Sequence, residues 1–219
     1  MSNSRILFAA MTLGMLAATP AVANDNFWLG VKGGTLGVGM EATWRPIPFF
    51  DLRAGGNTFT YDTDDSYSGV EYDVDLDMQT FFATANLRMP TSPFRLSAGL
   101  YSNGNKLALA SRDSATYEIG DMTYTAGEVG SLTGSIGFDS TAPYLGVGAD
   151  FRIANRFGLN LDLGVLWQGS ARVGVGVTGP IASDPTFMMD LETERLQLEE
   201  DLDDFKAYPV ASLGFSWNF

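Results

Sequence analysis

Residues 206–219 read KAYPVASLGFSWNF, and this stretch decides the fold. Taken in steps of two, one set of its side chains is apolar and ends in Leu213, Phe215, Trp217 and Phe219. The residues between them are mostly small or polar. Because successive side chains of a strand point to opposite faces, the stretch predicts a strand with one oily and one polar face. A last strand that ends on an aromatic residue is typical of bacterial outer-membrane β-barrels, although the edge of a soluble sandwich alternates in the same way.

The other end of the chain predicts export. Arg5 precedes the apolar run Ile6–Ala18, and Ala21-Val22-Ala23 forms a small-x-small cleavage site. These features predict a secretory signal peptide over residues 1–23, because the apolar run is too short to span a bilayer as a helix. The mature barrel domain would then comprise residues 24–219. The chain contains no cysteine, so it has neither a lipid-anchor cysteine nor a disulfide.

Alternation of the same kind recurs along the mature chain. It predicts eight strands: Asn26–Lys32, Thr35–Trp44, Phe50–Tyr61, Tyr72–Arg88, Phe94–Leu109, Leu132–Arg152, Phe157–Val177 and Lys206–Phe219. A tight turn at Gly33-Gly34 would join the first two, since glycine permits positive φ. The other connections alternate between short (Arg45–Phe49, Met89–Pro93, Ala154–Arg156) and long (Asp62–Glu71, Ala110–Ser131, Thr178–Phe205). Periplasmic turns and extracellular loops alternate in this way, so the sequence predicts an all-β, eight-stranded antiparallel transmembrane barrel.

The charges on the predicted inward faces are nearly balanced, although the full chain carries a formal net charge of −13. The candidate lumen residues are Lys32, Glu41, Asp51, Arg53, Arg88, Arg95, Asp150, Arg152 and Asp162. Charges in a narrow, poorly hydrated lumen must be paired or they are costly. The balance therefore favours an internal salt-bridge network that stiffens the barrel, and a polar track for a solute is the alternative.

Acidic residues gather in two predicted extracellular segments, 61–78 and 184–206. In the first segment, the candidates for steering cations to the barrel mouth are Asp62, Asp64, Asp65, Glu71, Asp73 and Asp75. A charge run is usually a solvated surface, and an electrostatic funnel for cationic solutes is the functional alternative. Asp73, Asp75 and Asp77 lack the glycine and the terminal glutamate of an EF-hand calcium loop, so we assign no metal ligand.

The last long connection contains a predicted helix. Asp184 followed by Pro185 has the pattern of an N-cap and a first helical residue. Leu191, Leu198 and Phe205 then recur at roughly helical spacing among acidic residues. We expect a short amphipathic helix that lies over the barrel mouth or its rim.

Composition argues against catalysis. The chain contains no histidine and no cysteine, so the commonest general base, thiol nucleophiles and the usual zinc sites are missing. The glycine-rich stretches 30–39 and 174–179 lack the lysine and helix that follow a phosphate-binding loop. So acidic a chain is also a poor partner for nucleic acid. We therefore expect a protein that is no enzyme and needs no cofactor.

Several segments resemble the CarO-type outer-membrane proteins. They are Tyr72–Met78, Ala85–Arg88, Ser97–Leu100 with Asn105, Ala142–Gly148, Gly164 with Gln168-Gly169, and Pro209-Val210 with Gly214 and Phe215. The most specific is the Ala-Pro-Tyr-Leu-Gly stretch at residues 142–146, and the similarity spans most of the mature chain in the same order. The resemblance implies an eight-stranded outer-membrane barrel of a Gram-negative bacterium. That family is associated with uptake of basic amino acids such as ornithine and with carbapenem susceptibility, but the resemblance assigns no substrate-binding residue.

Two functions are compatible with these features, and the sequence favours the first. One is a porin-like narrow channel for small cationic solutes such as basic amino acids, steered by the acidic loops. The other is a closed structural or surface-interaction barrel, because eight strands enclose a lumen that side chains can just fill. The inward glycines Gly55, Gly146, Gly148 and Gly164 would either leave gaps or let the barrel curve. The expected partners are the outer-membrane lipid bilayer and the barrel-assembly machinery, which would recognise the last strand through Phe219.

Overall fold

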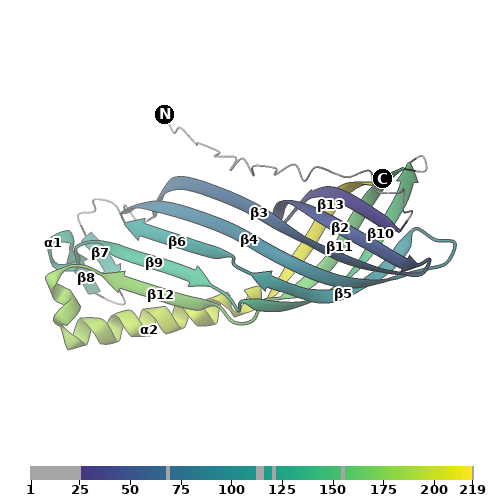
Figure 1. The fold of residues 1–219 in the computed structure, drawn as a ribbon. Helices are drawn as coiled ribbons and strands as arrows, with labels where there is room; N and C mark the ends of the chain where they lie inside the picture. The colour runs from purple at the N-terminus through teal and green to yellow at the C-terminus, as the bar shows by residue number, and fades with distance from the viewer. Residues whose placement is uncertain (1–25, 68–69, 112–115, 120–121, 154–155, 219) are drawn as a thin grey trace.

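Eight antiparallel strands form a closed barrel in the computed structural model, which describes residues 26–67, 70–111, 116–119, 122–153 and 156–218 (Figure 1). The barrel strands are β1 (Phe27–Gly34), β2 (Gly37–Ile47), β3 (Phe50–Tyr67), β4 (Val70–Arg88), β5 (Phe94–Asn103), β10 (Thr141–Ile153), β11 (Phe157–Trp167) and β13 (Ala207–Asn218). The barrel closes where β1 pairs with β13, from Trp28 opposite Asn218 to Gly34 opposite Ser212. The predicted barrel is confirmed. The predicted signal peptide and Phe219 lie outside the described residues.

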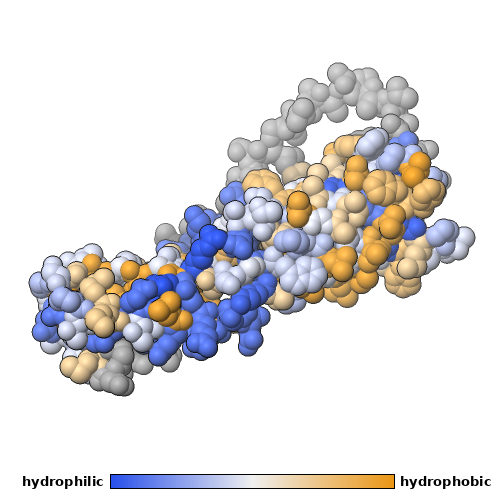
Figure 2. Space-filling model, turned by 90° about the horizontal axis from the view of Figure 1, so that it is seen from below, coloured by the Kyte–Doolittle hydropathy of each residue, from blue (hydrophilic) through white to orange (hydrophobic). Residues whose placement is uncertain are grey.

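The outer wall of the barrel is apolar. Its large exposed side chains include Val31, Met40, Leu52, Phe81, Leu96, Leu100, Leu145, Val147, Leu161, Leu163, Leu213 and Phe215. On the face shown in Figure 2, hydrophobic residues gather over the barrel, and hydrophilic residues are more frequent over the opposite half. A soluble monomer rarely exposes so large an apolar surface, but a barrel in a bilayer requires one.

The two ends of the barrel differ. The end with the short connections is called the turn end below, and the end with the long connections is called the loop end. At the loop end, β3 and β4 continue beyond the barrel and are joined by β6 (Lys106–Ser111), β9 (Leu132–Gly137) and β12 (Arg172–Val177). These five segments form an open sheet that projects from the barrel, as Figure 1 shows. We call it the loop-end sheet.

Three predicted strands are each divided into two at the rim between the barrel and the loop-end sheet. The strand predicted at Phe94–Leu109 becomes β5 and β6, Leu132–Arg152 becomes β9 and β10, and Phe157–Val177 becomes β11 and β12. Local backbone features interrupt these strands, and the alternation of apolar and polar residues does not reveal such features. Asn103 Oδ1 accepts a hydrogen bond from the Asn105 N–H (3.2 Å) between β5 and β6, and Gly169 has a positive φ of 75° after β11.

The predicted long loop at Asp62–Glu71 is wrong. β3 runs to Tyr67 and β4 begins at Val70, and the two strands remain paired along their whole length. The alternating acids suggested a solvated loop. These acids instead lie on a long hairpin, because the pairing of β3 with β4 continues without a break.

The predicted turn at Gly33-Gly34 is also wrong. Gly34 pairs with Gly37, so Thr35 and Leu36 form the two-residue turn, and Gly37 has a positive φ of 89°. Thr35 is held by β13, because its Oγ1 accepts from the Ala211 N–H (3.1 Å). This arrangement turns Leu36 into the barrel mouth, where it is buried.

The rest of the loop end forms a small unit with its own core, which we call the loop-end unit. It contains the hairpin of β7 (Thr116–Ile119) and β8 (Met122–Thr125), α1 (Ala126–Val129), η1 (Pro180–Ser183), α2 (Pro185–Asp201) and η2 (Leu202–Lys206). Its core consists of Tyr117, Val129, Phe187 and Leu191. Within the described part of the chain, no helix has the length and apolar character needed to cross a membrane.

The predicted helix after Asp184 is present. The Asp184 carboxylate accepts hydrogen bonds from the N–H groups of Thr186 (2.8 Å) and Phe187 (3.1 Å), as an N-cap does. Its predicted place over the mouth is wrong, because α2 lies along β12, the edge strand of the loop-end sheet (Figure 1). Glu199 Oε1 accepts from the Val173 N–H (2.9 Å), so the helix covers part of the open edge of β12.

Candidate functional site: the barrel lumen

An ionic layer fills the turn-end half of the lumen. Its centre is Arg53, whose guanidinium lies 3.0 Å from Asp150, 3.4 Å from Glu41 and 3.6 Å from Asp51. Arg53 is on β3 and Asp150 is on β10, and two strands separate them in the barrel. The ion pair therefore spans the lumen and ties its opposite walls together.

Further ion pairs surround this centre. Arg88 contacts both Asp51 (3.1 Å) and Asp150, and Arg95 contacts Asp162 (2.5 Å) and Asp150 (3.6 Å). On the other side, Lys32 lies 3.5 Å from Glu41. The structure places eight of the nine predicted lumen residues in this network: Lys32, Glu41, Asp51, Arg53, Arg88, Arg95, Asp150 and Asp162. The ninth, Arg152, lies instead over the Trp28 ring, 5.8 Å from its centroid.

Amide side chains complete the coordination of the central carboxylates. Asn86 Nδ2 donates to Asp51 (2.7 Å), which is fully buried, and Asn160 Nδ2 donates to Asp150 (2.7 Å). A buried carboxylate is costly unless its lone pairs are satisfied by charges and hydrogen bonds together. Both central aspartates meet that requirement.

Sequence reasoning missed one charged lumen residue. Arg45 was assigned to a short turn, but β2 continues to Ile47 and places its guanidinium 3.8 Å from Asp51 and 5.9 Å from the Trp28 ring centroid. The signal was present, because Glu41, Thr43 and Arg45 are two residues apart. The described lumen thus holds six bases and four acids, a formal excess of two positive charges: Lys32, Arg45, Arg53, Arg88, Arg95 and Arg152 against Glu41, Asp51, Asp150 and Asp162.

An aromatic layer fills the loop-end half of the lumen. The ring centroids of Phe82 and Tyr101 are 5.1 Å apart, and those of Tyr101 and Tyr144 are 5.2 Å apart. Apolar side chains pack around the rings, and they include Leu36, Met78, Ala142, Leu166 and Val210. Lys32 joins the two layers, because its Nζ lies 3.7 Å from the Phe82 centroid and also pairs with Glu41.

The inward glycines leave space that large side chains from other strands occupy; we call each such space a glycine slot. A Cβ on Gly55 would lie 2.8 Å from the Phe82 ring, and one on Gly164 would lie 2.6 Å from the Tyr144 ring. A Cβ on Gly148 would overlap the Arg95 guanidinium. The glycines leave no gaps at these points, since side chains from other positions occupy the space.

Little empty space remains inside the barrel. Three lumen cavities lined by described residues have volumes of about 20, 20 and 10 Å³. A space of this size holds about one water molecule. The described lumen is therefore closed in this conformation, by the ionic layer and then by the aromatic layer.

Comparison with known proteins identifies the fold. No family model matches the chain, and no curated protein matches it. Two crystal structures from Acinetobacter baumannii do match: CarO2, with 23% identity and a TM-score of 0.59, and CarO, with 21% identity and a TM-score of 0.58. Each match covers 88% of this chain, with 98% of CarO2 and 97% of CarO. This chain has the CarO fold.

The acids proposed to steer cations lie along the β3–β4 hairpin of this CarO-like barrel. In its register Asp62 is opposite Asp75 and Asp64 is opposite Asp73, and Asp62 and Asp75 are exposed. The register also sets Asp65 opposite Tyr72 and Glu71 opposite Ser66. These positions extend along the loop-end sheet and do not form a ring around the mouth. Among the described residues, no group of three or more acidic side chains could hold a metal ion.

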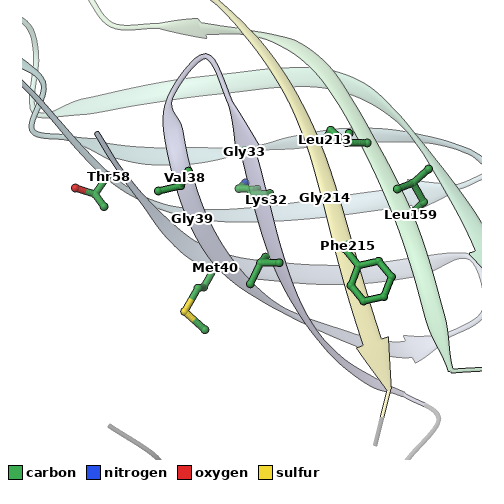
Figure 3. A pocket seen from close by; sticks show the side chains of 11 residues that line it. Lys32, Gly33, Val38, Gly39, Met40, Thr58, Leu159, Leu213, Gly214 and Phe215 are labelled. Carbon is green, nitrogen blue, oxygen red and sulfur yellow. The ribbon is translucent and has the colours of Figure 1, made fainter. Parts of the chain in front are cut away.

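A hollow lies on the outer wall of the CarO-like barrel. It is a groove of about 570 Å³ across β1, β2 and β13, next to Gly33, which leaves open space where a side chain would stand. Figure 3 shows the apolar side chains around it, including Val38, Met40, Leu213 and Phe215. The groove belongs to the mostly apolar outer surface.

Proposed function

We propose that this protein is an outer-membrane barrel with a closed lumen, and that its working part is the loop-end unit displayed outside the cell. The observation that carries this proposal is the packing of the lumen by two successive layers of side chains. The apolar outer wall and the CarO fold support the location in the outer membrane of a Gram-negative bacterium. The short turns would face the periplasm and the loop-end sheet would face the outside.

A solute would meet two different barriers in such a barrel. It would have to break ion pairs that span the lumen, and then separate rings that fit into glycine slots. Breaking a buried ion pair costs several kcal/mol, and packed rings have no neighbouring space to enter. The closed state is therefore the ground state in this proposal.

The loop-end unit has the properties of an interaction surface. It possesses its own core, so its shape does not depend on solutes or on the lumen. It also exposes large apolar side chains, among them Met122, Met188, Met189 and Leu196. Exposed apolar groups on a folded, otherwise polar surface are typical of contact sites. We propose contact with molecules or surfaces outside the cell, without catalysis, because the chain lacks histidine and cysteine.

The second candidate is slow passage of small cationic solutes such as basic amino acids. The exposed acids Asp62, Asp75 and Asp77 favour it, because a negative surface raises the local concentration of cations. The formal positive excess in the lumen opposes it, since a cation that enters would meet guanidinium groups. This candidate therefore requires a rearranged lumen.

Solute entry into liposomes separates the two functions. The refolded mature chain would be tested with ornithine, lysine, glutamate and a neutral sugar, and folding would be checked by migration on gels before and after boiling. We expect no entry above that of protein-free liposomes. Selective entry of ornithine and lysine, weakened by salt and by neutralising Asp62, Asp64 and Asp65, would establish the channel instead.

A deletion tests the interaction surface directly. Removing residues 112–131 takes away the β7–β8 hairpin and α1 but leaves every barrel strand. Cells that carry this variant should keep the permeability of the wild type and lose binding to external surfaces or molecules. Unchanged binding, in protein shown to be folded and exported, would remove the loop-end unit from the function.

A further inference from the structure

A cluster of arginines surrounds a small cavity at the turn end of the lumen. The cavity has a volume of about 20 Å³, and its charged lining consists of Arg45, Arg53, Arg88, Arg152 and Asp150. Asp51 lies just behind it, paired with Arg88 (3.1 Å) and Arg45 (3.8 Å). Four guanidinium groups thus face two carboxylates. The cavity has a local excess of two positive charges.

The excess charge belongs to Arg45 and Arg152. Arg53 and Arg88 each contact both aspartates. Arg45 reaches a carboxylate only at 3.8 Å, and Arg152 has none within ion-pair distance among the described residues. Both guanidinium groups lie over the Trp28 ring, at 5.9 and 5.8 Å from its centroid. Two like charges are therefore held near one ring without a full counter-charge.

Hydrogen-bond donors at this place lack acceptors. Trp28 Nε1 and Arg45 Nε are buried and have no hydrogen-bond partner among the described residues. Trp28 lines the cavity and is 7% exposed. A buried donor without a protein partner is rare in a folded chain, and such a donor commonly binds an ion or an ordered water. Asn160 Oδ1, also without a partner among the described residues, is an acceptor that suits a water beside the ion.

We propose that this cavity binds one small anion, of the size and charge of chloride. Guanidinium and indole N–H groups are donors only, so they select an acceptor, and the net charge selects a negative one. The volume excludes larger anions from the cavity itself. Arg152 is exposed, so the ion would enter from the turn end, and the site does not depend on passage through the lumen.

The test is the line width of ³⁵Cl NMR in the presence of the refolded chain in detergent micelles. Chloride would be varied against gluconate at constant ionic strength, so that general screening stays the same. We expect a saturable broadening in the wild type. Arg152→Gln and Arg45→Gln should each weaken the apparent affinity about tenfold, as expected for the loss of one charge-assisted hydrogen bond.

Control variants decide whether the effect belongs to this cavity. Arg152→Lys keeps the charge and should retain most of the broadening. Arg172→Gln removes an exposed arginine at the loop end, paired with Asp139, and should behave as the wild type. Broadening that does not saturate, that persists in the Arg45→Gln/Arg152→Gln variant or that falls equally in Arg172→Gln would overturn the proposal. The cavity would then hold water alone.

Discussion

The ionic layer and the aromatic layer fill neighbouring stretches of one lumen, but they depend on different kinds of residue. In the ionic layer the central charged groups touch several partners on different strands, as Arg53 does with Glu41 and Asp150. In the aromatic layer the rings depend on the absence of side chains, because Phe82 and Tyr144 occupy slots made by glycines. The first layer is sensitive to loss of charge, and the second is sensitive to added volume.

The largest effect is expected from Arg53→Met, which removes the centre of the ionic layer. Asp150, Glu41 and Asp51 would each lose a buried ion-pair partner, so we expect the free energy of unfolding to fall by about 3–5 kcal/mol. The measurement is unfolding of the refolded barrel in denaturant, followed by tryptophan fluorescence.

The matched control for this variant is Arg172→Met. Its side chain is 70% exposed and pairs with Asp139 on the surface, so the expected loss is under about 1 kcal/mol. Equal losses for the two arginines would mean that the lumen network contributes no more than a surface ion pair.

Gly148→Ala should have the next largest effect. The new methyl group would overlap the Arg95 guanidinium and push it away from Asp162 and Asp150. We expect a loss of about 2 kcal/mol, typical of overpacking. Gly33→Ala is the control, because the added methyl group meets open space on the outer wall. An unchanged free energy of unfolding in Gly148→Ala would show that Arg95 can move aside without loss of its ion pairs.

Lys32→Met tests the link between the layers with a smaller effect. The substitution keeps an apolar chain beside Phe82 but removes the charge that also pairs with Glu41. Glu41 keeps Arg53 as a partner, so we expect a loss of about 1 kcal/mol in the free energy of unfolding. Lys106→Met, at an exposed lysine of the loop-end sheet, should change stability less. The reverse order would contradict the proposed link.

Outside the lumen, a single carboxylate should have only a local effect. Glu128 accepts hydrogen bonds from the Thr125 hydroxyl (2.7 Å) and the Thr125 N–H (2.9 Å), and these bonds lower its pKa. Because the pKa is lower in the folded state, α1 is stabilised above the unfolded pKa. This stabilisation is lost as the pH falls through the folded pKa.

Hydrogen exchange measures this effect. The protection factor of the Thr125 amide should fall as the pH is lowered through that range, while amides of the barrel strands stay protected. In Glu128→Gln the protection at Thr125 should be weaker and should no longer depend on pH in this range. A pH dependence that survives the substitution would assign the titration to another group.

The sequence predicted the barrel because the alternation of apolar and polar residues follows from the two different environments on either side of each strand. Lipid outside and a packed lumen inside impose opposite demands on successive residues, so the inward charges at Arg53, Asp150 and Asp162 were identifiable before their partners were known. Arg45 was missed because the short connection was placed at Arg45–Phe49, whereas β2 continues to Ile47.

Features that depend on contacts between distant residues were not predictable in this way. The break between β11 and β12 depends on Gly169, and the hairpin at Asp62–Glu71 depends on pairing of two acidic strands. The position of α2 depends on the open edge of β12, which exists only after the loop-end sheet has formed. The occupied glycine slots likewise require knowledge of which side chain lies across the lumen.

The most direct test of the two-layer closure is the conductance of the refolded wild-type chain in a planar bilayer. Correct folding would be confirmed first by migration on gels before and after boiling. The layered lumen predicts no unitary current steps above those of a protein-free bilayer at either polarity. Reproducible steps of one size, from protein confirmed as folded, would contradict a closed lumen and favour the cation channel.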